Sequence, residues 1–267
     1  MTTYLITGAT GTLGHLATQA LRALEPTAHI AVLARPGADV DRLRESGAAV
    51  RRGDYDDPPS LRAACAGIER ALLVSSPVLD PTVRARQHLA FLDAAAAAGV
   101  AHLTYTSALG AEHDPGHHRT EQALAQGSTS HTILRNGLYT EPFVERAWQE
   151  ALTTGVVRSA TQGHALRTAS VRDLGLAAAH TLAAPLPGAT LELNGPGWTY
   201  DDLTDAITTR LGRPVRHESV DDAELGPFGP VHALFRAGLL AQSPAELTRL
   251  IGQAPRTAGE VLAVVAG

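Results

Sequence analysis

The chain has 267 residues, a formal net charge of −5 and a pI of about 6.2. Apolar residues make up 44% and charged residues 18%, which is typical of a globular protein and excludes a disordered chain. No basic run exceeds two residues and no apolar run approaches the length of a membrane span, so neither nucleic acid nor a membrane is an expected partner.

All 22 basic residues are arginine, so lysine chemistry is excluded. The single cysteine, Cys65, cannot form an internal disulfide, which suits a reducing compartment. The opening residues carry no positively charged leader, and we therefore expect a cytoplasmic protein. The expected partner is a small molecule, and the sequence is compatible with a homodimer.

Short β-rich runs alternate with amphipathic helices through the first half of the chain. The expected helices include His15–Leu24 and Val83–Ala98. This alternation predicts βαβ units and a Rossmann-like, doubly wound parallel sheet with helices on both faces. The expected strands are Tyr4–Thr7, His29–Ala34, Ala49–Arg52, Ala71–Ser75, His102–Thr106 and His131–Leu134.

A glycine-rich turn follows the first strand and opens the first helix. Gly8, Gly11 and Gly14 form a G-x-x-G-x-x-G pattern in this strand–turn–helix context. Glycine lets the backbone approach a pyrophosphate closely, and the helix N-terminus presents N–H groups and a positive dipole end to it. The pattern predicts dinucleotide binding, the alternative being a glycine-rich turn in another α/β protein.

The end of the second strand distinguishes the two nicotinamide cofactors. An NAD site usually places an acidic residue there, to bind the ribose 2′-hydroxyl. This chain has Arg35, whose charge and fork geometry match a 2′-phosphate. We therefore expect NADPH to be preferred, with NADH still possible. The alternative is a solvated arginine in a turn.

The alternation of strands and helices is less regular in the second half of the chain. Expected strands at Val156–Arg158, Leu166–Ala169 and Leu191–Leu193 mix with helices, one of which starts at a capping box made by Thr199 and Asp202. Residues 221–242 read as a small helical flap. We expect residues 1–155 to form the NAD(P)-binding domain and residues 156–267 to form a smaller α+β substrate lobe packed against it. The other expected helices are Val171–Leu182, Tyr200–Leu211, Pro244–Ile251 and Thr257–Val265.

Eight short motifs are spread over nearly the whole chain: GATGTLG, ARPG, GDYDD, LLVSSP, YTSALGA, ILRNGLYTE, VRDLGLAAA and LTRLIGQAPRT. Together they resemble the NmrA-like branch of atypical short-chain dehydrogenases, and within it the NADPH-dependent bacterial quinone oxidoreductases of type 2.

The resemblance implies a role for each matching position. Three sets have simpler alternatives: a loop cap for Asp54, strand-end hydroxyls for the two serines, and turn or core residues for Asn136 and Tyr139. The implied cofactor contacts are Thr10, Gly11, Thr12 and Leu13 at the pyrophosphate, Arg35 at the 2′-phosphate, Asp54 and Tyr55 at the adenine, Ser75, Ser76 and Pro77 at the nicotinamide ribose, and Thr106 and Ser107 at the nicotinamide ring. Asn136, Gly137 and Tyr139 would line the substrate cleft.

Many relatives in the wider superfamily use a Tyr-x-x-x-Lys pair, which this chain lacks. Counting back from Glu121 places His117 at the lysine position and His113 at the tyrosine position. Residues 114–116, Asp-Pro-Gly, would break the helix that such a pair needs. We therefore expect His113 on a loop and keep His117 as a candidate catalytic residue, since imidazole titrates near neutrality. Ser107 is the second catalytic candidate, expected to bond a substrate carbonyl.

Three histidines, His113, His117 and His118, lie close together in sequence. Two zinc ligands on a helix need i, i+4 spacing, which the Pro-Gly break prevents for the first two. We therefore expect no metal site here.

The missing pair constrains the substrate. Hydride transfer to an ordinary ketone leaves an alkoxide whose conjugate acid has a pKa near ~16, by analogy with water. Transfer to a quinone leaves a phenolate-like oxygen near ~10, by analogy with tyrosine, which is roughly 8 kcal/mol easier. The sequence therefore predicts an NADPH-dependent reductase of quinones or activated aromatic carbonyls, with Phe228 and Phe235 of the flap covering a flat ligand or simply packing on the sheet.

Two other functions remain open from the sequence. One is a ketoreductase that tailors aromatic, angucyclinone-type polyketides. The other is a regulator that senses NADP without turnover.

Overall fold

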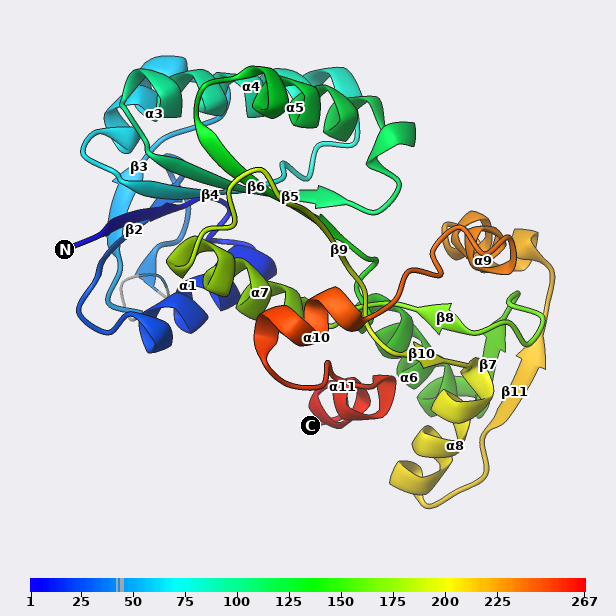
Figure 1. The fold of residues 1–267 in the computed structure, drawn as a ribbon. Helices are drawn as coiled ribbons and strands as arrows, with labels where there is room; N and C mark the ends of the chain where they lie inside the picture. The colour runs from blue at the N-terminus through cyan, green and yellow to red at the C-terminus, as the bar shows by residue number, and fades with distance from the viewer. Residues whose placement is uncertain (42, 44–45) are drawn as a thin grey trace. The chain divides into compact units, whose positions relative to one another are not determined.

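The computed structural model describes residues 1–41, 43 and 46–267 (Figure 1). These residues divide into two compact units. The first contains Met1–Asn136 and Arg172–Glu192, and the second contains Gly137–Val171 and Leu193–Gly267. The domain boundary expected from the sequence, between residues 155 and 156, falls inside the second unit.

A seven-stranded sheet organises the first unit. Its order is β3-β2-β1-β4-β5-β6-β9. Strands β2 and β3 therefore lie on one side of β1, and the chain then crosses over so that β4 pairs with the other side of β1. The pairings from β3 to β6 are parallel. The strands are β1 (Thr3–Ile6), β2 (His29–Ala34), β3 (Ala49–Arg52), β4 (Arg70–Val74), β5 (His102–Ala108), β6 (Ser130–Asn136) and β9 (Thr190–Leu193). This is the predicted Rossmann-like α/β fold.

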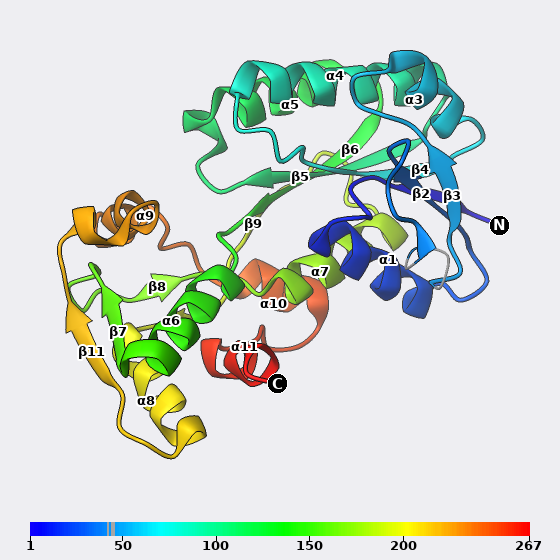
Figure 2. The same cartoon turned by 180° about the vertical axis from the view of Figure 1, so that it is seen from behind.

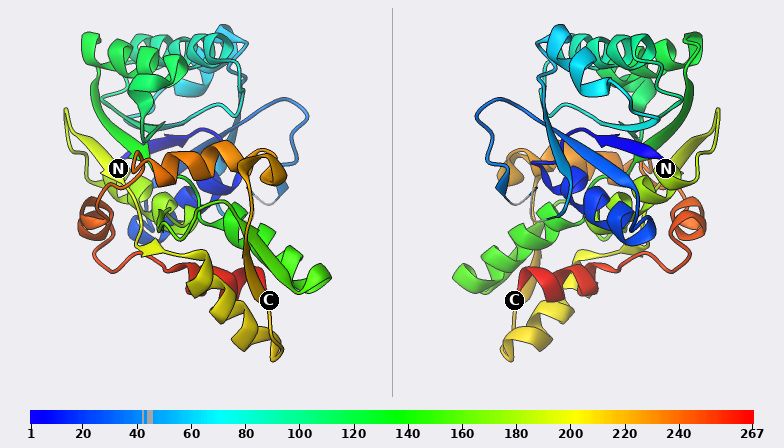
Figure 3. Two further views of the ribbon diagram at one scale, coloured as in Figure 1. Left: turned by 90° about the vertical axis from the view of Figure 1, so that its right-hand side faces the viewer. Right: turned by 90° about the vertical axis from the view of Figure 1, so that its left-hand side faces the viewer.

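Helices cover both faces of this sheet (Figures 1 and 3). One face carries α3 (Pro58–Cys65), α4 (Pro81–Ala97) and α5 (Pro115–Gln126), and the other carries α1 (Thr12–Leu24) and α7 (Val171–Ala183). A short 3-10 helix, η1 (Ala111–His113), precedes α5.

The core between the sheet and helices α3 to α5 explains why these segments fold together. Leu5, Leu73 and Leu103 from the strands meet Leu61 and Phe91 from the helices, and all five are at most 1% exposed. Complete burial of one such side chain stabilises the fold by about 2 kcal/mol. The sheet edge that carries the loops is therefore held on a rigid support.

The second unit contains two two-stranded sheets and several helices (Figure 2). Strand β7 (Val156–Ser159) pairs in parallel with β11 (Arg216–Ser219), and β8 (Leu166–Arg167) pairs antiparallel with β10 (Gly197–Trp198). The expected flap contains η2 and α9. The helices are α6 (Glu141–Thr154), α8 (Tyr200–Leu211), η2 (Asp222–Leu225), α9 (Phe228–Arg236), α10 (Ala245–Ile251) and α11 (Ala258–Val265).

Helix starts follow local capping chemistry. The predicted capping box of Thr199 and Asp202 is present at α8. Helix α4 begins at Pro81, two residues before the predicted start, because the Asp80 side chain accepts the Thr82 and Val83 N–H groups. No helix in the described part of the chain is long and apolar enough to cross a membrane.

Candidate cofactor and active site

The loop between β1 and α1 requires glycine at two positions for steric reasons. Gly8 has a φ of +62°, and a Cβ added there would lie 2.9 Å from Val74 Cβ. A Cβ on Gly14 would lie 2.5 Å from the Gly8 carbonyl oxygen. Only glycine permits this close approach of helix to turn, which is the geometry that a pyrophosphate-binding loop needs.

The N-terminus of α1 is open to a ligand. Gly11 is the N-cap residue and, having no side chain, makes no side-chain cap bond to the first turn. Thr10, Gly11 and Thr12 are exposed, whereas Leu13 is buried beneath them. Free N–H groups and the positive end of the helix dipole suit a phosphate. These residues fit a dinucleotide pyrophosphate.

Two arginines lie at the ends of neighbouring strands. Arg35 directly follows β2 and is exposed. Arg52 ends β3, pairs with Ala34 in the sheet register, and donates from Nη1 to the Arg35 carbonyl oxygen at 2.9 Å. Arg52 is not among the residues expected from the sequence to bind the cofactor, although its place at the end of the third expected strand indicates it. Both guanidinium groups are candidates for a 2′-phosphate.

Asp54 and Tyr55 have partners of their own. Asp54 Oδ1 accepts the Asp56 N–H at 3.0 Å, which is a loop cap. The Tyr55 hydroxyl lies 2.6 Å from Thr7 Oγ1 and 2.9 Å from the Val74 carbonyl oxygen. Tyr55 thus ties the loop after β3 to the ends of β1 and β4, and its contact with adenine remains a prediction.

A buried histidine positions the loop that follows β4. The Ser76 N–H donates to His88 Nε2 at 2.9 Å, so the proton of neutral His88 is on Nδ1. Nδ1 lies 3.0 Å from Thr120 Oγ1 and 3.3 Å from the Tyr105 hydroxyl, which in turn lies 2.7 Å from His117 Nδ1. This array connects the loop to α5.

Burial keeps the array neutral. It lowers the pKa of His88 to about 3, with help from His117 and Arg84, and it raises the pKa of Tyr105. Burial and then Arg84 lower the pKa of His117, which is 6% exposed. At neutral pH, therefore, no residue of the array is a ready acid.

The rest of the same loop is held by side chains. Ser75 N–H donates to Thr106 Oγ1 at 3.0 Å, and Ser76 Oγ donates to Gln87 Oε1 at 2.5 Å. Ser75 is half-buried and Pro77 is exposed. The residues expected beside the nicotinamide ribose are therefore fixed in place, with Ser75 and Pro77 the more accessible.

The Ser107 hydroxyl is hydrogen-bonded to the carboxylate of Glu121. It donates to Glu121 Oε1 at 2.6 Å, and Arg135 binds the same carboxylate with Nε at 3.1 Å and Nη2 at 2.7 Å. The bonds from Arg135 and Ser107 outweigh burial and lower the pKa of Glu121, so this carboxyl is ionised at neutral pH. A hydroxyl that donates to Glu121 cannot at the same time donate to a substrate carbonyl, which was its expected role.

His113 and His118, which are close to His117 in sequence, do not take part in the buried array. The His113 side chain is 85% exposed, next to Glu112. His118 Nε2 lies 2.9 Å from Gln122 Nε2. No group of three potential metal-binding side chains occurs within the described ranges.

The candidate substrate residues lie in both units. Asn136 ends β6 in the first unit, is 7% exposed, and its Oδ1 has no hydrogen-bond partner among the residues that the structure describes. Gly137 and Tyr139 belong to the second unit, where a Cβ on Gly137 would lie 2.6 Å from Asn194 Oδ1. Tyr139 is 37% exposed.

The two flap phenylalanines pack within the second unit. Their rings lie edge-on to Phe143, with centroids 5.3 Å away for Phe228 and 6.0 Å for Phe235. Phe235 is 5% exposed, whereas Phe228 is half-buried beneath the Arg146 guanidinium. Phe235 is thus a core residue, and Phe228 is the more accessible of the two.

The fold and the loop geometry agree with comparisons to known proteins. Residues 8–146 match a family model described as NAD(P)H-binding. Quinone oxidoreductase 2 of Escherichia coli (strain K12) is 35% identical over 226 residues, which cover 82% of this chain and 78% of that protein. The chain belongs to the NAD(P)H-binding, NmrA-like branch of the short-chain dehydrogenases. The resemblance found in the sequence is confirmed.

Two solved structures extend the match over nearly the whole chain. The Citrobacter sp. triphenylmethane reductase complexed with NADP(H) has a TM-score of 0.89 and 29% identity, covering 98% of this chain and 99% of that one. The NADPH-dependent quinone oxidoreductase from Escherichia coli, complexed with NADPH, has a TM-score of 0.86 and 30% identity, covering 99% and 100%. Both of these proteins are named as reductases or oxidoreductases. The open glycine loop described above fits the cofactor.

A second polar cluster resembles a hydrolase triad but cannot act as one. In the second unit, Ser159 Oγ lies 2.8 Å from His217 Nε2, and His217 Nδ1 lies 2.6 Å from Asp201 Oδ1. Ser159 has no exposed surface and also contacts Thr161 Oγ1 at 3.1 Å. A nucleophile must be accessible to its substrate, and Ser159 is not. The cluster therefore has a structural role, in which its hydrogen bonds link β7, α8 and β11.

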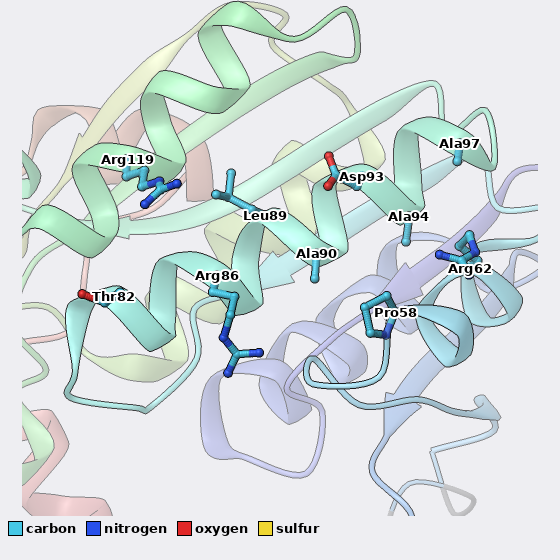
Figure 4. Close-up of a pocket in the computed structure, with 10 residues that line it drawn as sticks. All are labelled: Pro58, Arg62, Thr82, Arg86, Leu89, Ala90, Asp93, Ala94, Ala97 and Arg119. Atoms are coloured by element: carbon cyan, nitrogen blue, oxygen red, sulfur yellow. The ribbon is translucent and has the colours of Figure 1, made fainter.

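A hollow of about 660 Å³ lies on the outer side of helices α3 to α5 (Figure 4). It is lined by Pro58, Arg62, Thr82, Arg86, Leu89, Ala90, Asp93, Ala94, Ala97 and Arg119. None of the predicted cofactor or substrate residues lines it.

Proposed function

We propose that the protein is an NADPH-dependent reductase that delivers hydride to a quinone or a similarly conjugated acceptor. The observation that carries this proposal is the hydrogen bonding and burial of the polar groups at the end of β5 and on α5. Glu121 is ionised and accepts the hydrogen bond of the Ser107 hydroxyl, and burial keeps His117 a neutral imidazole. No described group there supplies a proton readily, so an acceptor that tolerates the added charge is favoured.

Each part of the chain has a task in this proposal. Bound NADPH supplies the hydride. The glycine loop and the first turn of α1 bind the pyrophosphate, and Arg35 with Arg52 binds the 2′-phosphate, which gives the preference for NADPH over NADH. His88 and Gln87 hold the loop after β4. The protein thus contributes mainly binding and orientation.

A cationic dye is a second candidate acceptor, favoured by the likeness to triphenylmethane reductase. Hydride addition to a carbocation yields a neutral product and needs no proton. This reaction suits a site without an acid as well as quinone reduction does.

NADPH oxidation with a panel of acceptors tests the proposal. We expect turnover with menadione that exceeds turnover with an aliphatic ketone by at least about 100-fold, a conservative fraction of the roughly 8 kcal/mol difference in product stability. A preference for polycyclic aromatic ketones over quinones would favour the polyketide ketoreductase. Cofactor binding without turnover of any acceptor would favour the NADP-sensing regulator.

A further inference from the structure

The bond between Ser107 and Glu121 fixes the direction of hydrogen bonding at the end of β5. An ionised carboxylate has no proton, so the hydrogen in this 2.6 Å contact comes from Ser107. This length is typical of a charge-assisted O–H···O⁻ bond. The Ser107 oxygen therefore has lone pairs left and no free proton.

The surrounding charges keep Glu121 in this state. Arg135 forms a two-pronged bond to the Glu121 carboxylate, and its Nη1 also lies 3.8 Å from Glu112 and 3.6 Å from Glu192. Glu121 is 8% exposed and Ser107 is 4% exposed, so water competes weakly for their bond. Protonation of Glu121 would weaken both of its bonds to Arg135.

We propose that Glu121 holds Ser107 as a hydrogen-bond acceptor, and that the bound ligand presents an N–H or O–H donor to the Ser107 oxygen. This inference deepens the proposed function and rests on the cofactor-binding part of it. Ser107 is the residue that contacts the ligand, and Glu121 is a positioning residue that acts through it. Asn136 ends the neighbouring strand β6, and its Oδ1 has no hydrogen-bond partner among the described residues, so it is another acceptor at the same edge of the sheet.

Two ligand groups carry such a donor. One is the carboxamide NH₂ of the nicotinamide, and the other is a hydroxyl beside the reacting carbonyl of the acceptor. A bare carbonyl oxygen does not satisfy Ser107, because two acceptors would then face each other.

The first arm of the test measures binding and needs no turnover. Dissociation constants for NADP⁺ and for its 3-acetylpyridine analogue, in which a methyl group replaces the NH₂, are determined with the wild-type protein and with Ser107→Ala. If the donor is the carboxamide, we expect the wild type to bind NADP⁺ roughly fivefold more tightly than the analogue, which is the usual net effect of one hydrogen bond. Ser107→Ala would reduce this ratio to near one.

The second arm identifies the other source. The kcat/KM ratio of 5-hydroxy-1,4-naphthoquinone to 1,4-naphthoquinone is compared between the wild type and Ser107→Ala. If the donor is the substrate hydroxyl, the substitution lowers this ratio roughly fivefold and leaves the binding ratio unchanged. If Ser107→Ala changes neither ratio, the proposal is wrong.

Glu121→Met tests the positioning role. It releases the Ser107 proton, while Arg135 keeps Glu112 and Glu192 nearby. The freed hydroxyl can donate to the bare carbonyl of the 3-acetyl group or of 1,4-naphthoquinone and can still accept from a donor. In the arm that responds to Ser107→Ala, we therefore expect the affinity or kcat/KM of the ligand without the donor to rise. The same quantity for the ligand with the donor should change little.

Glu112→Met is the matched control, since Glu112 is near Arg135 but does not contact Ser107. It should leave both ratios unchanged. Equal behaviour of the two methionine variants would overturn the role of Glu121. A protein that shows the binding effect but oxidises no NADPH would contradict the proposed function and leave this inference standing.

Discussion

At the scale of single residues, we propose that two arginines at the ends of β2 and β3 decide cofactor preference. Arg35 is exposed and free to bind a phosphate through its fork. Arg52 donates from Nη1 to the carbonyl oxygen of Arg35, which places its guanidinium group at the same turn. Together they place two positive charges where the 2′-phosphate of NADPH is expected.

We predict that Arg35→Ala raises the KM for NADPH about 10- to 100-fold, which corresponds to the loss of a charged hydrogen bond, and changes the KM for NADH little. Arg52→Ala should act in the same direction but less strongly. Steady-state kinetics with both cofactors provide the measurement, and Arg62→Ala, an exposed arginine on α3, is the control. An equal effect on both cofactors would remove the arginines from 2′-phosphate recognition.

At the scale of the element, the loop after β4 depends on a helix that is distant in sequence. The Ser76 N–H is satisfied by His88 of α4, a side chain with no exposed surface. The position of this loop is therefore set by α4 and, through Thr120 and Tyr105, by α5 and β5.

We predict that His88→Leu lowers the free energy of unfolding by about 2 kcal/mol, because a buried backbone N–H loses its acceptor. The substitution should also weaken NADPH binding through displacement of Ser75 and Ser76. Urea denaturation and fluorescence titration measure the two effects. His118→Leu, on the exposed side of α5, should change neither; an unaltered His88→Leu protein would show that the loop does not need this bond.

Periodicity and capping predicted the elements well. The strands at residues 29–34 and 49–52 and helix α8 have the predicted bounds, and the glycine loop lies where its spacing placed it. The contacts between elements could not be predicted. His88 sits in an alanine-rich helix with no motif around it, and the Ser107–Glu121 bond joins residues whose proximity depends on how α5 packs on the sheet. These bonds arise from tertiary packing, which a local pattern does not encode.

At the scale of the whole molecule, buried histidines make stability depend on pH, and for three of them the lowered pKa lies well below neutrality. His88 and His102 lie in the first unit and His232 in the second. Burial lowers the pKa of His88 to about 3 and that of the other two to about 4, with smaller contributions from nearby arginines. In the unfolded chain each would titrate near its ordinary pKa of ~6.5.

The sign of the pH dependence follows from these values. As the pH falls below about 6.5, the unfolded chain binds protons that the folded histidines still exclude, so the free energy of unfolding decreases. Each group contributes a slope approaching about 1.4 kcal/mol per pH unit, down to a pH near its folded pKa. The stabilisation by the neutral histidines is fully present above about pH 6.5. Most carboxylates change the free energy of unfolding only below about pH 4.5, so the histidine effect is seen between these two values.

His232 allows this effect to be isolated in one unit. Its Nδ1 accepts the Ala160 N–H at 3.1 Å, so protonation would break a buried bond. Both tryptophans, Trp148 and Trp198, belong to the second unit, and their fluorescence therefore follows the unfolding of that unit. We predict that His232→Gln, whose amide oxygen can accept the same N–H but does not titrate, is less stable at pH 7.5 yet loses less stability between pH 6.5 and 4.5. Urea titrations across this range measure the slope, and a slope equal to that of the wild type would show that His232 does not titrate on unfolding.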